Sequence, residues 1–276
     1  MVLRIFCKLP PTKGAEFALY AQKHTPYQPR NSMTTTKNIY TALLLLLLAP
    51  ALAGAQTVAE LVELGNQNIK SHSYVPAIDN FKKALAQNPN DEAALNGIIR
   101  AYTLSGDHKD AQRFVDMALE QQPNNAEFIM RHGILLNHKG NFDKAVEVFA
   151  SAMQQHPNEG IAIQVLMNKA AAELNLNNFG AAIDDYSSVL EIDPRSTNAY
   201  SYRGMANYKA GNYKEAVDDY TYALDLDPSL VLAYYNRGMA LLKLQDKTKA
   251  CADFQKACKG KNTNACKMIV IECQRR

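Results

Sequence analysis

Four cysteines near the end of the sequence have a spacing that could serve a metal site or disulfide bonds. They stand at Cys251, Cys258, Cys266 and Cys273, seven, eight and seven residues apart. A four-thiolate zinc site needs its ligands at one point, whereas seven residues along a helix span about 10 Å. In an antiparallel helix pair centred on Asn262, Cys258 would face Cys266 and Cys251 would face Cys273. We therefore expect two cross-helix disulfides and no metal site.

Three cations are each followed, sixteen residues later, by an aspartate. The pairs are Lys169 with Asp185, Arg203 with Asp219, and Arg237 with Asp253. At the equivalent positions earlier in the chain, cation and carboxylate are both missing. Because they occur together or not at all, we expect partly buried ion pairs between two helices. The alternative is a proton-transfer or ligand site, but three near-identical copies fit repeated architecture better than a single active centre.

The remaining polar residues form no catalytic constellation. The histidines after residue 55 are His72, His108, His132, His138 and His156, and none is spaced with Cys, Asp or Glu like a metal or nucleophile set. His132 stands at a core-type position, and the others lie near predicted turns or on exposed faces. No serine lies in a nucleophile elbow, and no glycine loop could cradle a phosphate. We expect no enzymatic activity and no cofactor.

An internal repeat in the sequence determines where these residues lie in the fold. Prolines follow one another at intervals of 34, 34, 37 and 34 residues, at Pro89, Pro123, Pro157, Pro194 and Pro228. Small and large apolar residues precede each proline at helical spacing, and proline cannot continue a helix. Glycine or asparagine, which tolerate the left-handed conformation that ends many helices, stands near the middle of most units. The pattern of each unit therefore predicts a helix, a tight turn and a second helix that ends before the proline.

Residues 197–230, TNAYSYRGMANYKAGNYKEAVDDYTYALDLDPSL, resemble a tetratricopeptide repeat almost position for position. The small and aromatic positions of that family are occupied by Gly204, Ala216, Ala223, Tyr200, Tyr213 and Tyr220. The resemblance implies an all-α, right-handed α-solenoid of six helix-turn-helix units with a C-terminal capping helix. We assign the solenoid to 56–276, the cap to 263–274, and the units to 58–91, 92–125, 126–159, 163–196, 197–230 and 231–264.

Three departures from the repeat are expected to matter. Residues 160–162 are an insertion, so that either the next helix starts earlier or the solenoid hinges there. The sixth unit has Gln245 and Asp246 where others have a glycine turn. The first unit has His72 at its turn and Pro76 early in its second helix, where proline is tolerated.

An apolar run that includes six consecutive leucines, residues 43–48, precedes the repeats. It is short for a membrane span, which needs about 20 apolar residues, and small residues follow it as a signal peptidase requires. We expect a signal peptide over 33–55, cleaved between Ala55 and Gln56, and an over-extended, disordered start over 1–32. The alternative is an uncleaved N-terminal anchor.

Removal of this leader changes the charge of the chain. The whole sequence has 30 Lys and Arg against 27 Asp and Glu, with six of the cations and one of the anions in residues 1–55. The mature part therefore has 24 cations and 26 anions, a net charge of −2. Nucleic-acid binding would need a clustered cationic face. We expect neither nucleic-acid binding nor a membrane span in the mature chain.

The cysteine segment 250–273, ACADFQKACKGKNTNACKMIVIEC, also resembles the cysteine-rich Sel1-like repeats of secreted bacterial proteins. In those repeats such cysteines bridge adjacent helices. Disulfides persist in oxidising compartments. Together with the leader, this indicates an exported protein of the periplasm, the cell surface or the extracellular space.

In the tetratricopeptide family, the first helices line a concave groove that holds peptide segments. The resemblance places in it Tyr202, Met205, Tyr208, Lys209, Tyr235, Asn236, Met239 and Lys243 of the fifth and sixth units. The earlier units add a more polar wall of Asn66, Asn96, Arg100, Arg131 and Asn137. Some members grip a C-terminal carboxylate with a Lys/Asn/Arg clamp, but Val62 replaces its first lysine here, which disfavours a chaperone-tail receptor.

We therefore expect a non-enzymatic protein–protein interaction scaffold of the bacterial cell envelope, with a protein or peptide partner. One alternative is a structural subunit of an envelope complex that docks by its convex face. Another is a solenoid that binds glycan or peptidoglycan. Any single groove residue could also pack against a neighbouring helix instead of contacting a ligand.

Overall fold

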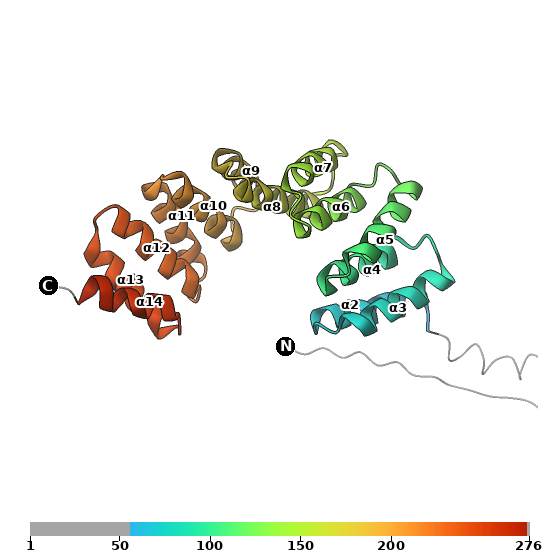
Figure 1. Cartoon of the computed structure of the whole chain (residues 1–276), viewed down its shortest axis with the longest axis horizontal. Helices are drawn as coiled ribbons and strands as arrows, with labels where there is room; N and C mark the ends of the chain where they lie inside the picture. Colours follow the sequence, from blue (N-terminus) through green and yellow to red (C-terminus); the bar gives the residue numbers. More distant parts are fainter. Residues whose placement is uncertain (1–55, 275–276) are drawn as a thin grey trace, which may run out of the picture. The chain divides into compact units, whose positions relative to one another are not determined.

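The computed structural model describes residues 56–274 (Figure 1). The expected signal peptide and over-extended start lie outside the described residues. Within 56–274 there is no strand, and no helix is both long and apolar enough to cross a membrane. The α-helices are α2 (Val58–Lys70), α3 (Tyr74–Gln87), α4 (Glu92–Ser105), α5 (His108–Gln121), α6 (Ala126–His138), α7 (Phe142–Gln154), α8 (Glu159–Asn175), α9 (Phe179–Ile192), α10 (Thr197–Ala210), α11 (Tyr213–Leu226), α12 (Val231–Lys243), α13 (Lys247–Lys259) and α14 (Thr263–Met268).

The helices form six helix-turn-helix pairs, α2–α3 to α12–α13, and α14 caps the last pair (Figure 1). Each pair packs on the next in chain order. First helices also touch the following first helix, as α2 touches α4, α4 touches α6 and α10 touches α12. First helices therefore line one face of the row and second helices the other. The expected all-α solenoid of six units with a cap is confirmed.

The turns inside the units contain a left-handed residue whether or not glycine is present. Gly106, Gly140 and Gly211 have φ angles of 84°, 76° and 87°. Gln245 and His72, at the same place in the sixth and first units, adopt φ angles of 62° and 58°. The turn geometry is thus kept where the sequence lacks the residue that favours it.

The insertion at residues 160–162 lengthens a helix. α8 begins at Glu159 and has 17 residues. Asn158 caps it, since its side-chain oxygen accepts a hydrogen bond from the backbone N–H of Ile161 at 3.0 Å. Of the two expected outcomes, the structure has the earlier helix start.

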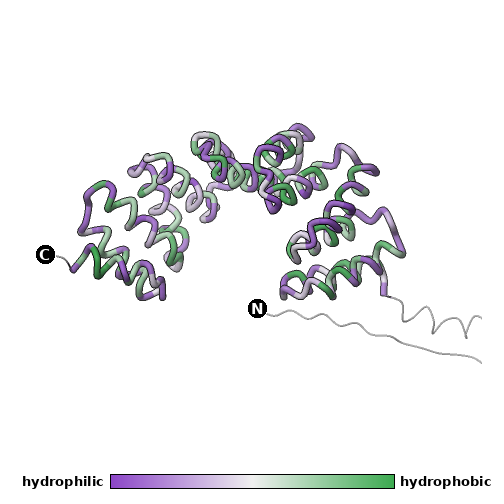
Figure 2. The backbone as a smooth tube through the Cα atoms, viewed as in Figure 1, coloured by the Kyte–Doolittle hydropathy of each residue, from purple (hydrophilic) through white to green (hydrophobic). Residues whose placement is uncertain are grey.

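The core is built from large side chains that pack against glycines. Phe81 is fully buried and lies against Gly65 and Gly97, and a Cβ atom on Gly65 would come within 2.6 Å of its ring. Phe149 packs on Gly133 in the same way. Apolar and polar residues alternate along each helix (Figure 2). Because the buried clusters join successive pairs, no pair has a core of its own.

The end of the cap differs from the regular helix expected over 263–274. α14 ends at Met268, and a π-helical turn, η1 (Ile269–Cys273), continues it. In this turn the backbone N–H of Gln274 donates to the carbonyl of Ile269 at 3.1 Å. The widened turn ends at a cysteine that is bonded to α13.

Candidate functional site

The structure brings together the three expected cation–aspartate pairs. The distances are 2.8 Å for Lys169 Nζ to Asp185 Oδ1, 2.7 Å for Arg203 Nη2 to Asp219 Oδ1, and 2.8 Å for Arg237 Nε to Asp253 Oδ2. Each pair links the two helices of one unit. The aspartate side chains are 5 to 11% exposed. Burial raises the pKa of Asp185, and the bond to Lys169 opposes this shift.

The two arginines also reach into the preceding unit, which the sequence analysis missed. Arg203 Nη1 donates to Ser187 Oγ, and Arg237 Nη1 donates to Thr221 Oγ1, both at 3.0 Å. The hydroxyl residue stands sixteen positions before the arginine, so the same periodicity could have found it. Each guanidinium therefore ties its own unit to the one before.

The cysteines pair as their spacing predicts. Cys251 is bonded to Cys273 and Cys258 to Cys266, with Cα–Cα distances of 5.8 and 4.8 Å. The first bond joins α13 to η1 and the second joins α13 to α14. Both fasten the cap to the sixth unit.

Two histidines lie together that the sequence analysis did not connect. The rings of His108, on α5, and His138, on α6, are 6.0 Å apart between centroids. The buried His108 Nδ1 has no hydrogen-bond partner in the described part of the chain. Burial, and then His108, lower the pKa of His138. Burial also lowers the pKa of His132, which is half-buried as its core-type position implies.

The groove face carries a chain of cavities along α8, α10 and α12. The first has a volume of about 430 Å³, and Met167, Leu174, Tyr202, Met205 and Lys209 are among its lining residues. Tyr202 is 44% exposed and its ring stacks on that of the buried Tyr186, with 5.9 Å between centroids. This cavity thus lies between the fourth and fifth units.

Two further cavities adjoin the first. One, of about 450 Å³, lies between α10 and α12 and is lined in part by Tyr202, Met205 and Leu232. The other, of about 280 Å³, is lined in part by Met205, Tyr208 and Met239. Because Met205 lines all three cavities, they form one continuous apolar surface.

Seven of the eight groove residues expected from the fifth and sixth units line these cavities. Lys243 lines none of the three. Sequence analysis missed the contribution of the fourth unit, which includes Met167, Asn168 and Leu174. These residues stand at the same positions within their unit as the expected ones, so the repeat register would have identified them.

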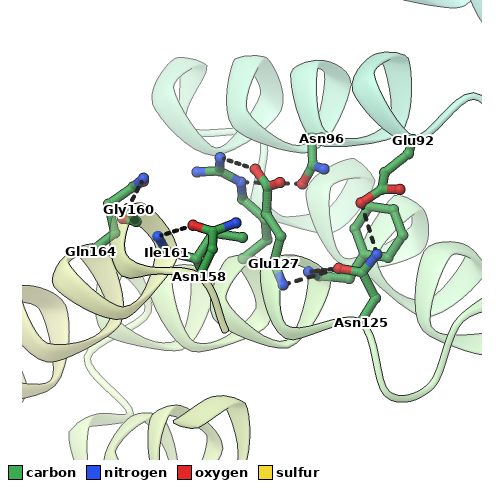
Figure 3. Close-up of polar contacts among 10 residues, drawn as sticks. Glu92, Asn96, Asn125, Glu127, Asn158, Gly160, Ile161 and Gln164 are labelled. Atoms are coloured by element: carbon green, nitrogen blue, oxygen red, sulfur yellow. Dashed lines mark hydrogen bonds and ion pairs between the residues drawn. The ribbon is translucent and has the colours of Figure 1, made fainter. Parts of the chain in front are cut away.

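The polar wall of the earlier units is partly occupied by its own contacts. Arg131 Nη2 donates to Glu127 Oε1 at 2.8 Å, and Arg131 Nε donates to Asn96 Oδ1 at 3.4 Å. Figure 3 shows Asn96 and Glu127 facing one another across α4 and α6. Asn137 donates to the backbone carbonyl of Asn168 at 3.0 Å. Asn96 and Arg131 are therefore already hydrogen-bonded to each other, and a ligand would have to compete with this contact.

Comparisons with known proteins place the sequence among repeat proteins. Family models described as tetratricopeptide or TPR repeats match residues 69–130, 105–160, 163–196, 204–245 and 231–263. The Hsp70-Hsp90 organizing protein 3 of Arabidopsis thaliana is 28% identical over 144 residues, which are 50% of this chain. The match spans only 23% of that protein.

Solved structures share the fold at low sequence identity. Pseudomonas aeruginosa pilF superposes with a TM-score of 0.63 and 16% identity, over 72% of this chain and 89% of that one. MamA of Desulfovibrio magneticus RS-1 gives a TM-score of 0.56 and 21% identity, over 61% of this chain and 94% of that one. YrrB superposes with a TM-score of 0.54 and 21% identity, over 67% of this chain and 95% of that one. The repeat models, which match most of residues 69–263, show that the chain belongs to the tetratricopeptide repeat family.

Proposed function

We propose that this protein is a non-enzymatic scaffold that binds a protein or peptide segment along the first helices of its fourth to sixth units. The observation that carries the proposal is the continuous apolar surface of three cavities joined at Met205. A surface of this kind on a folded chain marks an interaction site more often than a solvated face.

The side chains of this surface suit a ligand with apolar residues. Tyr202 and Tyr235 offer broad rings with a polar tip, and methionines adapt their shape to different partners. Leu232 at the edge is 67% exposed and would be covered by a bound segment. The apolar groups would supply most of the affinity.

Amide side chains accompany the apolar ones. Asn168 lines the first cavity, Asn198 the second, and Asn236 both the second and the third. An amide can donate and accept, as a peptide group does. These asparagines would therefore bind the main chain of an extended segment, while the cavities receive its side chains.

Two relatives support this class of function. YrrB is described as a TPR protein with an unusual peptide-binding site. The Arabidopsis relative is named as an organizer of Hsp70 and Hsp90. Both point to a polypeptide ligand, and neither identifies the partner of this chain.

The test is a selection of short random peptides against the folded protein, followed by affinity measurement of the selected peptides. Replacement of both Tyr202 and Tyr235 by alanine should weaken binding by about tenfold or more, because aromatic anchors dominate such contacts. Tyr222→Ala is the matched control, since Tyr222 is 57% exposed and lines none of the three cavities. Equal affinity of the double variant and the wild type would reject the groove.

We also propose that the protein is exported to the cell envelope or beyond it. The two cap disulfides support this, because such bonds persist in oxidising compartments. Intact mass of protein from its native host should correspond to a chain that starts at Gln56. It should also lack the four hydrogens that two disulfides remove. Four free thiols would contradict the proposal of export, whereas a retained leader would favour the N-terminal anchor over a cleaved signal peptide.

A further inference from the structure

Positive charge is concentrated at one end of the solenoid. Residues 247–276, from the start of α13 onward, contain eight Lys and Arg against two Asp and Glu. Residues 56–246 contain 16 against 24. The near-neutral total of residues 56–276 therefore hides a separation into an acidic body and a basic end, with net charges of −8 and +6. Such asymmetry is typical of a chain that meets an anionic surface with one end.

The lysines around the turn between α13 and α14 are not neutralised by the chain itself. Lys259, Lys261 and Lys267 are exposed, and among residues 56–274 none of them has a hydrogen-bond or ion-pair partner. Asp253, one of the two acidic residues of this end, is buried and bonded to Arg237 of α12 at 2.8 Å. The positive charge of the three lysines is therefore available to a partner.

Two aliphatic side chains lie exposed beside these lysines on the cap, the last element of the row (Figure 1). Val270 and Ile271 are 60 and 43% exposed. Lys267 precedes them by three and four residues, so that the three share one face of the cap. Met268 and Ile269, between them, pack instead against the apolar cluster of the sixth unit. The outer face of the cap thus combines aliphatic surface with positive charge.

We propose that this face of the cap docks on the anionic surface of a lipid membrane. The cap patch consists of Lys259, Lys261, Lys267, Val270 and Ile271. Anionic headgroups attract lysines at a membrane surface, and aliphatic side chains enter the boundary between headgroups and acyl chains. Because the patch lines none of the three groove cavities, the groove stays open while the cap is bound.

A soluble polyanion, such as an acidic polypeptide or a nucleic acid, is the other partner that lysines would suit. Val270 and Ile271 favour the membrane, because ion pairs with a polyanion alone would leave both side chains in water. The two cap disulfides fasten α14 and η1 to α13, so the lysines and the aliphatic pair are presented together without ordering further chain.

Vesicle flotation tests the inference. Residues 56–276 are used because they form a compact unit without the leader, which could itself enter lipid. The vesicles contain phosphatidylcholine alone or phosphatidylcholine mixed with phosphatidylglycerol. The protein should float with the anionic vesicles only, and high salt should release most of it. Equal partition onto both kinds of vesicle, or onto neither, would overturn the inference.

A triple variant, Lys259→Gln with Lys261→Gln and Lys267→Gln, tests the charge of the patch. Partition onto anionic vesicles should fall about a hundredfold, because each lysine near such a surface contributes about fivefold. The matched control removes the same charge from exposed lysines of α2, α7 and α11, by Lys70→Gln, Lys144→Gln and Lys214→Gln. A loss in the control as large as in the patch variant would show that net charge alone drives binding, against the inference.

Val270→Ser with Ile271→Ser separates lipid from a soluble polyanion. The variant keeps every lysine, and its partition onto anionic vesicles should fall about tenfold because two aliphatic groups no longer leave water. Unchanged partition would assign the patch to a polyanion and reject the membrane.

The inference is independent of the proposed groove. Both patch variants should bind a selected groove peptide with wild-type affinity, since the patch lines none of the cavities. Loss of that affinity would show that the substitutions act through the fold of the sixth unit, and would overturn a separate docking face. Failure of the Tyr202 and Tyr235 test would reject the groove and leave vesicle binding unaffected.

Discussion

Asp219 is the centre of the best-connected polar cluster in the described chain. Its Oδ1 accepts from Arg203 Nε at 3.1 Å and from Nη2 at 2.7 Å. Its Oδ2 accepts from Asn207 at 2.9 Å, a contact that the spacing of the charges did not reveal. With a side chain only 5% exposed, Asp219 satisfies two donors that are themselves largely removed from water. The cluster is therefore expected to fix the geometry of the unit more than to add net stability.

Asp219→Ala should destabilise the protein by about 3 kcal/mol, because Arg203 would lose its anionic partner and the Asn207 amide its acceptor. Urea unfolding followed by circular dichroism measures the change. The double variant Arg203→Met with Asp219→Leu should recover a large part of the loss, because it removes the buried cation together with its partner.

An exposed ion pair provides the control for this measurement. Asp79 Oδ2 and Lys83 Nζ lie 2.7 Å apart, but the two side chains are 62 and 57% exposed, respectively. Asp79→Ala should change the stability little, since water solvates the remaining lysine. A loss for Asp219→Ala as small as that for Asp79→Ala would contradict a buried cluster.

At the scale of elements, local chemistry made much of the fold predictable. Proline stops and small residues at helical spacing located the helix pairs, since these features act within one unit. The early start of α8 was one of two open outcomes, because three inserted residues can extend a helix or bend a junction. The π-turn of η1 was not predictable, since no residue type between Ile269 and Cys273 specifies it.

The candidate site was predictable where it follows the repeat register and unpredictable where it depends on neighbours. Tyr202 and Met239 were expected to line a groove because of their positions alone, and they line cavities. The approach of His108 to His138 comes from packing between units. A single sequence shows which face a residue occupies, but not which polar groups are already satisfied.

A helix pair should be able to open without its distant neighbours. Phe81→Ala would leave a cavity between Gly65 and Gly97 and cost about 3 kcal/mol or more. Hydrogen exchange read by mass spectrometry should then show lost protection in α2 and α3. Protection in α10 to α14 should be unchanged, because the main contacts of each described helix pair are with adjacent pairs.

Phe149→Ala is the matched variant in the third unit, where the ring packs on Gly133. Its loss of protection should centre on α6 and α7. A uniform loss across residues 56–274 in either variant would mean that the solenoid unfolds as one cooperative block.

At the scale of the whole molecule, apolar clusters hold both halves of the solenoid, but the halves differ in the polar contacts that accompany these clusters. The first three units share a large apolar cluster that includes Phe81, Tyr102, Phe114 and Phe128. The last three units add directional polar contacts between and within units. The hydrogen bonds of a guanidinium–carboxylate pair are directional, so they add a geometric requirement to that of apolar packing. The groove cavities lie in the half with the stricter geometry.

The hydrogen bonds from Arg203 to Ser187 and from Arg237 to Thr221 restrict which unit can precede another in the solenoid. A unit that carries the arginine needs a hydroxyl in the unit before it, and the fifth unit supplies both. A tandem duplication of residues 197–230 would give every new guanidinium a hydroxyl acceptor and every new hydroxyl a guanidinium donor. The sixth unit has Gln255 in place of the hydroxyl, and the third has Ala150. A copy of the fifth unit would therefore satisfy this requirement at both of its ends, and it would lengthen the groove.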